Sequence, residues 1–219
     1  MDKINKVLEF YTLTNSLKDK IRSGVSLWHI SKNRLESVAE HIYGTCMLAI
    51  ALDSEYNFNI DIKKSILMLT IHELEEIFIG DLTPFDNITR EEKIEKGEKA
   101  VSEILSGLVK KEEYLQLTKE YNRKLTPEAK FASNCDKLEM LLQMKIYEEL
   151  GYSNLNHEEN KILLENEWVK ELISTRSSTI ADLFFDFHTP SFDEDIVFKD
   201  ISNYARNNNI TKTLKLNNK

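Results

Sequence analysis

The stretch HELEEIFIGDLTP, residues 72–84, is the most informative part of the sequence for the fold. It places the imidazole of His72 next to the carboxylate of Glu73 on a predicted helix. A lone histidine, His41, precedes it within SVAEH, and a lone acid, Asp136, follows it within NCDKL. With His72 and Glu73, these residues offer two imidazoles and two carboxylates, a mixed ligand set suited to a divalent transition ion. The order histidine, histidine-acid, acid therefore predicts a metal-dependent hydrolase.

The composition predicts an all-α protein. The chain of 219 residues has only 6 Gly and 3 Pro and is rich in Leu, Ile, Glu and Lys, so it avoids turn residues and favours helix formers. A chain of this length is expected to form one domain. We expect a single domain over residues 1–219, with the site core at about 28–150, a C-terminal helical extension at about 151–205 and a frayed tail at 206–219.

Charge and cysteine content restrict the partners. The 29 basic and 37 acidic residues give a net charge of −8, which works against non-specific binding to nucleic acid or to an anionic membrane. Cys46 and Cys135 lie in apolar helical contexts and fit buried, reduced thiols better than a disulfide framework. The N-terminus begins an amphipathic stretch, and no segment approaches the length needed to span a bilayer. We therefore expect a cytoplasmic protein without nucleic-acid or membrane partners.

Start and stop signals outline the first helices. The spacing of apolar residues predicts an N-terminal helix that ends near Gly24, followed by a loop over residues 24–36. The sequence SVAE, residues 37–40, is a capping-box arrangement that starts a second helix. His41 is expected in the first turns of that helix, beside its apolar stripe.

The next predicted helix carries the adjacent histidine and acid. Asp61 is a suitable N-cap, and the apolar spacing continues to Ile79, where Gly80 supplies a stop. On one continuous helix, His72 and Glu76 would share a face, because residues four apart are neighbours on a helix surface. We therefore expect this helix to border the site.

The second half of the chain is also predicted to be helical. A second capping box at residues 89–92 starts a helix that runs to about Val109. Beyond Gly151, a long helical pattern continues to Phe184 and is followed by a break at residues 189–190. These segments show no second active-site pattern.

Asp136 lies on a predicted helix of its own. Thr126 can cap that helix, Pro127 occupies its first position, and the pattern ends near Gly151. Small and apolar neighbours on the same face predict that Asp136 is at least partly buried. A buried acid needs a partner. A shared ion would explain the burial of all four candidate ligands, whereas the alternative is a buried network of ion pairs.

At these residues the chain resembles the HD-domain phosphohydrolase superfamily, in the branch similar to 5′-deoxynucleotidases of the YfbR and HD-domain-containing-2 type. The matching stretches are RLESVAEH at 34–41, HELEEIFIGDLTP at 72–84 and CDKL at 135–138. They span about half of the chain, and the C-terminal third adds little. The resemblance implies an HD-domain helical bundle.

The resemblance also implies a ligand set. One divalent ion, which could be Co, Mn, Mg, Zn or Fe, would be held by His41, His72, Glu73 and Asp136, with water and the substrate phosphate completing its shell. Glu73 departs from the family, which usually has Asp after the second His. The longer side chain could shift the ion, alter metal preference or abolish binding, although Glu is a competent oxygen ligand.

Four further residues take roles by resemblance. Glu76 would orient or deprotonate the attacking water, and Asp81 would contact the substrate or protonate the leaving alcohol. Arg34 would lie on the phosphate side, and Trp28 would lie near the nucleoside. The alternatives are a salt-bridging role for Glu76, a solvated surface position for Arg34 and an ordinary packing role for Trp28.

The function that follows by resemblance is removal of phosphate from nucleoside 5′-monophosphates or their deoxy forms by a metal-activated water, in a homodimer. One alternative is a nucleotide-binding regulatory protein that lacks turnover because Glu73 replaces Asp. Another is a relative of the His-Glu-x-x-His peptidases, which would leave His41 and Asp136 unexplained. A paired-metal carboxylate bundle would need two Glu-x-x-His motifs, which the sequence lacks.

Overall fold

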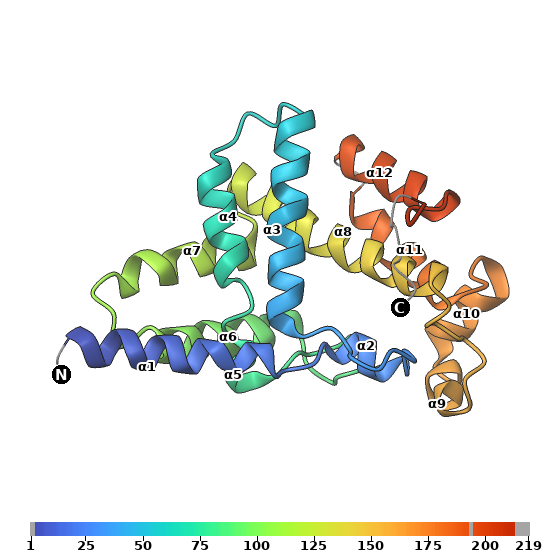
Figure 1. Ribbon diagram of the computed structural model, residues 1–219, viewed down its shortest axis with the longest axis horizontal. Helices are drawn as coiled ribbons and strands as arrows, with labels where there is room; N and C mark the ends of the chain where they lie inside the picture. Colours follow the sequence, from blue (N-terminus) through green and yellow to red (C-terminus); the bar gives the residue numbers. More distant parts are fainter. Residues whose placement is uncertain (1–2, 193–194, 213–219) are drawn as a thin grey trace. The chain divides into compact units, whose positions relative to one another are not determined.

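The computed structural model describes residues 3–192 and 195–212, and these residues form an all-α fold, as expected (Figure 1). The β-type pairing within this part of the chain is an isolated antiparallel bridge between Ile21 and Ser37. The chain divides into two compact units. The first unit comprises Met1–Ser23 and Glu36–Asp136, and the second comprises Gly24–Leu35 and Lys137–Lys219. The expectation of a single domain stays a prediction.

The first unit holds the helices that carry the candidate ligands. Its elements are α1 (Lys3–Asn15), the 3₁₀ helix η1 (Ser16–Lys18), α3 (Val38–Glu55), α4 (Ile62–Ile71), α5 (Glu76–Ile79), α6 (Arg90–Ile104), α7 (Lys111–Arg123) and the first part of α8 (Pro127–Glu149). Helix α3 packs against α4, and α6 packs against both α5 and α7. Their shared core consists of Leu17, Val38, Ile71, Leu74, Val101, Ile104, Leu105 and Leu115.

The N-terminal helix ends at Asn15, so its predicted end near Gly24 is wrong. The chain leaves the helix because residues 20–22 pair in extended form with the segment before α3. The Lys20 carbonyl accepts a hydrogen bond from Val38 N at 2.8 Å, and Arg22 N donates to the Glu36 carbonyl at 3.0 Å. A short helix, α2 (Ser23–Leu27), lies in the segment predicted to be a loop.

Helix α3 begins at the predicted capping box. Ser37 Oγ accepts a hydrogen bond from Glu40 N at 3.3 Å, and Glu40 Oε2 accepts one from Ser37 N at 2.9 Å. Two backbone donors of the first turn are thereby satisfied. The cap fixes the start of the helix and hence the position of His41 one turn later.

The helix predicted to run from Asp61 to Ile79 is interrupted. Helix α4 ends at Ile71, and the next residues form a tight turn before α5. A side-chain hydrogen bond marks the break, since His72 Nδ1 donates to the Leu69 carbonyl at 2.6 Å. In a continuing α-helix, that carbonyl would accept from the amide of residue 73. The prediction that His72 and Glu76 lie on one continuous helix is therefore wrong.

Several predicted boundaries agree with the structure. Gly80 ends α5 with φ 81°, and Thr89 forms the second capping box at the start of α6. Pro127 opens α8, which extends to Glu149. Helix α6 ends at Ile104 and not near Val109, because the chain turns after it: Leu108 N donates to the Leu105 carbonyl at 2.9 Å.

The long helix predicted between residues 151 and 184 is wrong, because the second unit contains several short helices. New caps start two of them: Asn166 Oδ1 accepts from Trp168 N, and Thr179 Oγ1 accepts from Asp182 N, both at 3.1 Å. The elements that follow α8 are η2 (Glu158–Asn160), α9 (Lys161–Leu164), α10 (Glu167–Thr175), α11 (Ile180–His188), η3 (Thr189–Phe192) and α12 (Ile196–Asn207).

The second unit has an aromatic core. The rings of Phe192 and Phe198 stack with centroids 5.9 Å apart, and Phe185 is buried in the same unit. Arg206 Nη1 donates to Asp186 Oδ1 at 2.6 Å, which links α12 to α11. Residues 206 and 207, predicted to belong to a frayed tail, are therefore part of α12, and residues 213–219 of that tail lie outside the described residues.

Two smaller expectations concern thiols and membranes. Cys46 and Cys135 are both free thiols, Cys135 being buried and Cys46 partly buried. Among the helices of the described residues, none has the length and apolar character required to cross a bilayer.

Replacement of Ser37 by Ala removes the side chain that caps α3. We expect the free energy of unfolding to fall by about 1 kcal/mol, the usual cost of losing an N-cap. Urea denaturation followed by circular dichroism measures the change. Ser54→Ala, an exposed position in the last turn of the same helix, is the matched control, and equal stabilities of the two variants would contradict the capping role.

Candidate metal centre

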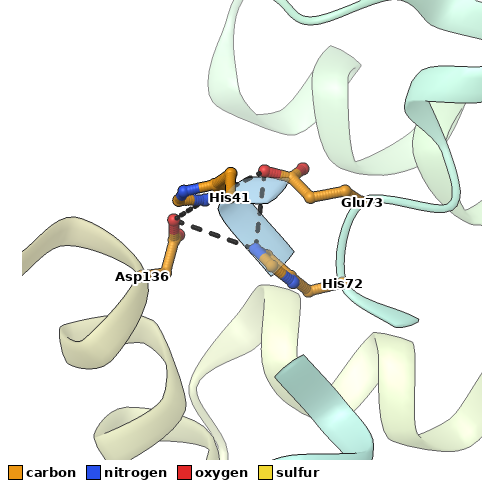
Figure 2. Close-up of side chains that lie close together, drawn as sticks. All are labelled: His41, His72, Glu73 and Asp136. Atoms are coloured by element: carbon orange, nitrogen blue, oxygen red, sulfur yellow. Dashed lines mark hydrogen bonds and ion pairs between the residues drawn. The ribbon is translucent and has the colours of Figure 1, made fainter. Parts of the chain in front are cut away.

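His41 is the first of the candidate ligands and lies one turn into α3. Its side chain is 1% exposed, so the imidazole is buried. His41 Nε2 lies 3.0 Å from Oδ1 of Asp136, which projects from the middle of α8 (Figure 2). This contact joins two helices far apart in the sequence.

The turn after α4 brings His72 and Glu73 to the same place. Glu73 Oε1 lies 3.4 Å from His72 Nε2 and 3.6 Å from His41 Nε2. The carboxylate of Glu73 therefore reaches both imidazoles despite its additional methylene group. The turn, rather than a shared helical face, allows two adjacent residues to point toward one centre.

The four candidate ligands form a closed ring of contacts (Figure 2). The fourth contact, between His72 Nε2 and Asp136 Oδ1, measures 3.8 Å. Ligand atoms that each lie about 2.1 Å from one ion are at most about 4.2 Å apart, and the four contacts fall within this limit. The structure thus brings together all four residues predicted from the sequence.

His72 provides an independent test of whether these residues suit a metal. Its Nδ1 carries the proton, because that atom donates to the Leu69 carbonyl. Its Nε2 therefore presents a lone pair toward the ring, and this buried atom has no hydrogen-bond partner among the described residues. A buried acceptor left unpaired costs about 1–3 kcal/mol. A divalent cation would satisfy this atom, so the site chemistry fits a metal.

Tyr121, on α7, supports the Asp136 carboxylate and was missed by the sequence analysis. Its hydroxyl donates to Asp136 Oδ2 at 2.8 Å, and its ring makes an edge contact with His72 at 5.4 Å between centroids. Burial and the nearby Asp136 raise the pKa of Tyr121 well above its usual value, so the phenol stays protonated and continues to donate. A residue that only hydrogen-bonds to a candidate metal ligand, as Tyr121 does, has no recognisable sequence pattern of its own.

Arg22 was also missed, although it is the guanidinium in contact with the acids of this region. Its Nη1 lies 3.1 Å from Glu73 Oε1, 3.5 Å from Asp81 Oδ2 and 3.8 Å from Glu76 Oε1. Burial alone would lower the pKa of Arg22, but Glu73, Asp81 and Glu76 outweigh it and raise the pKa. The extended pairing before α3 places Arg22 here, a long-range contact that local sequence patterns do not report.

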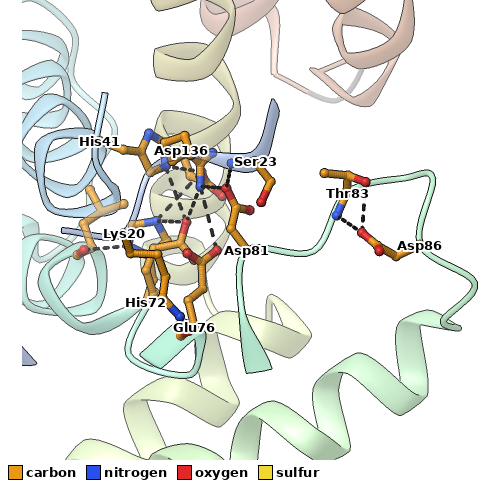
Figure 3. A network of polar contacts seen from close by, with 12 residues as sticks. Lys20, Ser23, His41, His72, Glu76, Asp81, Thr83, Asp86 and Asp136 are labelled. Carbon is orange, nitrogen blue, oxygen red and sulfur yellow. Dashed lines mark hydrogen bonds and ion pairs between the residues drawn. The ribbon is translucent and has the colours of Figure 1, made fainter. Parts of the chain in front are cut away.

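Glu76 and Asp81, the predicted catalytic acids, belong to one network of polar contacts (Figure 3). Both lie within 4 Å of Arg22 Nη1. Glu76 is 1% exposed, and Lys20 Nζ donates to its backbone carbonyl. Burial, together with Glu73 and Asp81, raises the pKa of the Glu76 carboxyl to about 11. A positive charge in addition to that of Arg22 would therefore be needed to favour its ionised form.

Asp81 is held by the loop that follows α5. Its Oδ2 accepts a hydrogen bond from Ser23 N at 2.7 Å. Farther along the same loop, Asp86 Oδ2 accepts from Thr83 N at 2.7 Å and from Thr83 Oγ1 at 2.9 Å (Figure 3). The polar turn predicted in this segment thus stabilises the loop that carries Asp81.

Different neighbours lower the pKa of each of the two acids in the ring. Burial alone would raise the pKa of Glu73, but His72 and Arg22 outweigh it and lower the pKa below its usual value. Burial also opposes ionisation of Asp136, yet the hydrogen bond from His41 and the nearby His72 ring lower its pKa well below the usual range. Both carboxylates are therefore held in the charged form that binds cations.

Trp28 and Arg34, the predicted substrate-binding residues, belong to the second unit. Trp28 is buried at 3% exposure, and Arg34 is exposed. Their roles toward a substrate stay predictions.

Comparison with known proteins agrees with this geometry. The HD domain family model matches residues 14–174, so the chain belongs to the HD domain family. A relative from Dictyostelium discoideum, named 5′-deoxynucleotidase HDDC2, is 37% identical over 74% of this chain and 86% of its own length. The human protein of the same name is 31% identical over 80% of this chain and 88% of its own.

A solved structure gives the same fold. A conserved hypothetical protein from Pyrococcus furiosus is 29% identical, with a TM-score of 0.57 over 76% of this chain and 96% of that protein. The family and the all-α HD-domain fold expected from the sequence are therefore confirmed.

Replacement of Tyr121 by Phe removes one hydroxyl and leaves the ring that contacts His72. Because the hydroxyl orients Asp136, we expect the affinity for Mn²⁺ or Co²⁺ to fall about 10-fold or more, as for other residues that support metal ligands. Isothermal titration calorimetry measures the change. Tyr43→Phe, an exposed position on α3, is the control, and an affinity equal to that of the parent would refute the supporting role.

Proposed function

We propose that this protein removes the phosphate group from deoxynucleoside 5′-monophosphates. The proposal rests on one observation above all, the ring of His41, His72, Glu73 and Asp136 with an unpaired imidazole nitrogen facing its centre. It is supported by relatives named 5′-deoxynucleotidases, which match most of the chain. The coarser expectation, a metal-dependent phosphohydrolase, is confirmed by family membership and these relatives.

The four residues of the ring would hold one divalent ion. A bound ion supplies two effects: it lowers the pKa of a coordinated water, and it offsets the charge of the phosphate. The protein prepares this site by keeping Glu73 and Asp136 ionised and by fixing the His72 tautomer. Co, Mn, Mg, Zn and Fe all remain candidates for the ion.

Glu76 and Asp81 would act on protons. Glu76 is buried next to the ligand Glu73. A bound ion would lower its raised pKa, and its carboxylate would then orient the attacking water and accept its proton. Asp81 is held by Ser23 N and would contact the leaving alcohol. Arg22 contacts both acids, and its positive charge partly compensates their negative charge.

Of the arginines near the candidate site, Arg22 is the one whose position best supports a contact with the substrate phosphate. A guanidinium has five donors in a planar fork and can bind carboxylates and phosphate oxygens at the same time. Arg22 already contacts Glu73, a member of the ring. Arg34 was assigned this role from the sequence, so the two arginines are rival candidates.

A homodimer and a cytoplasmic location are further parts of the proposal. The homodimer rests on the resemblance to the 5′-deoxynucleotidase branch, and the cytoplasmic location rests on the two cysteines, which fit a reducing compartment. Sedimentation equilibrium of the purified protein would test the dimer.

Purified protein loaded with Co²⁺, Mn²⁺ or Mg²⁺ is expected to release phosphate from a panel of ribo- and deoxyribonucleoside 5′-monophosphates, the deoxy forms being preferred. His72→Ala, prepared in parallel, should release none, because it lacks the imidazole whose Nε2 faces the ring. Phosphate release measured by a colorimetric assay separates the activity of the protein from that of a contaminant.

If the protein released no phosphate from any nucleotide of this panel, the proposal would be overturned. If calorimetry then showed tight nucleotide binding, the protein would be a nucleotide-binding regulatory module in which Glu73 does not support turnover.

Replacement of Arg22 by Gln is expected to lower kcat/KM for the best nucleotide about 10- to 100-fold, because a hydrogen bond to a charged group contributes about 1.5–3 kcal/mol. Arg34→Gln, at an exposed position of the second unit, is the matched comparison and should stay near the parent value. The reverse result would favour the sequence-based assignment to Arg34. Urea denaturation of both variants shows whether a loss of activity reflects a loss of folded protein.

A further inference from the structure

A second cluster of metal-capable side chains lies in the second unit. His29, His157 and Glu159 each offer a ligand atom, and these atoms lie within 4.8 Å of one another. The cluster joins two separate segments, the loop that follows α2 and the turn that begins η2. None of its members belongs to the HD-type ring.

The orientation of the His29 ring is fixed by a buried amide. Asn160 is fully buried, and its Nδ2 donates to the Asn154 carbonyl at 3.0 Å. Its Oδ1 must therefore accept, and the atom 2.9 Å away, His29 Nδ1, carries the proton. This leaves a lone pair on His29 Nε2, which lies 3.5 Å from Glu159 Oε2. Histidines that bind metals are oriented in the same way, with the second nitrogen donating to an oxygen.

His157 completes the cluster from the other side. Its ring stacks on that of His29, with centroids 5.5 Å apart and planes 5° from parallel. Its Nδ1 lies 3.8 Å from Glu159 Oε2 and also accepts from Glu159 N at 3.4 Å, a long hydrogen bond that is easily given up. One carboxylate oxygen thus lies near a ring nitrogen of each histidine.

The two nitrogen–oxygen distances are compatible with a shared ion, and the exposed His157 ring, which lies parallel to that of His29, would rotate to bring both lone pairs to one point. Both nitrogen–oxygen separations, 3.5 and 3.8 Å, exceed the usual 2.7–3.2 Å or so of a hydrogen bond. They lie below the limit of about 4.2 Å for two ligands of one ion. An ion pair between His29 and Glu159 would also require a second proton on the imidazole, whereas a divalent ion binds the neutral ring.

The surroundings of His29 hold its side chain in place. Its backbone has φ 48°, a left-handed conformation that few residues other than glycine adopt. Two residues farther on, Ser31 N and Ser31 Oγ donate to the Tyr152 carbonyl at 2.8 and 3.0 Å. The imidazole is therefore presented by a loop tied to the segment that carries its partners.

We propose that His29, His157 and Glu159 form a second metal site, which takes a divalent ion of the zinc class. Two imidazoles and one carboxylate are a ligand set that Zn²⁺ binds in proteins, and Ni²⁺ and Cu²⁺ also favour imidazole. The side chains are 35%, 40% and 66% exposed, so water can fill the remaining coordination positions. Binding would fasten the loop that contains Trp28 to the start of η2.

Equilibrium dialysis of the full-length protein against Zn²⁺ tests the site by counting bound ions. We expect His157→Ala and Glu159→Gln each to bind one ion per chain fewer than the parent, at a zinc concentration that saturates the parent. Glu158→Gln is the matched control, because this neighbour is 87% exposed and pairs with Lys161. Variants that bind as many ions as the parent would overturn the proposal.

A second measurement separates this site from the HD-type ring. His72→Ala should keep the Zn²⁺ ion bound in the second unit, and the double variant with His157→Ala should lose it. Loss of every ion in His72→Ala alone, with circular dichroism showing a folded chain, would place all zinc binding in the first unit and refute the second site.

Discussion

The hydrogen bond from the His72 ring to the Leu69 carbonyl is the interaction on which the metal centre depends. It lies where α4 stops and the candidate ligands begin, and it ties the ring to the last turn of that helix. It also fixes which ring nitrogen is protonated, and thereby directs the other nitrogen to the centre. Because the chain turns here, Glu73 points to the same place as its neighbour, which adjacent residues of a helix cannot do.

Around this centre the protein concentrates negative charge away from water. Glu76 and Asp81 lie within 4 Å of Arg22, which also contacts the ligand Glu73. Acids gathered around one cation repel one another and oppose folding unless positive charge compensates them. Arg22 supplies part of that compensation, and a divalent ion would supply the rest. An ion held by Glu73 and Asp136 would therefore also offset the charge of the neighbouring Glu76 and Asp81.

The sequence was sufficient to predict that four metal-capable residues belong together and where several helices start, because these depend on residue type and local spacing. Ser37 and Thr89 form capping boxes as expected, and the four ligands meet. The break after α4, which a side-chain hydrogen bond marks, was missed because the apolar periodicity continues through it. Arg22 and Tyr121 were missed for another reason: their roles come from pairing between distant segments.

The turn at residues 72–75 also affects how this site can change during evolution. On a rigid helix, one additional methylene would carry a carboxylate past its target, whereas a turn lets the backbone absorb the difference, and here Glu73 still reaches both imidazoles. Exchange between Asp and Glu is therefore open to neutral drift at this position. His72 has no such latitude, because its ring both donates to the last turn of the helix and supplies a ligand. Two adjacent residues of one motif thus differ in how much change their local structure can accommodate.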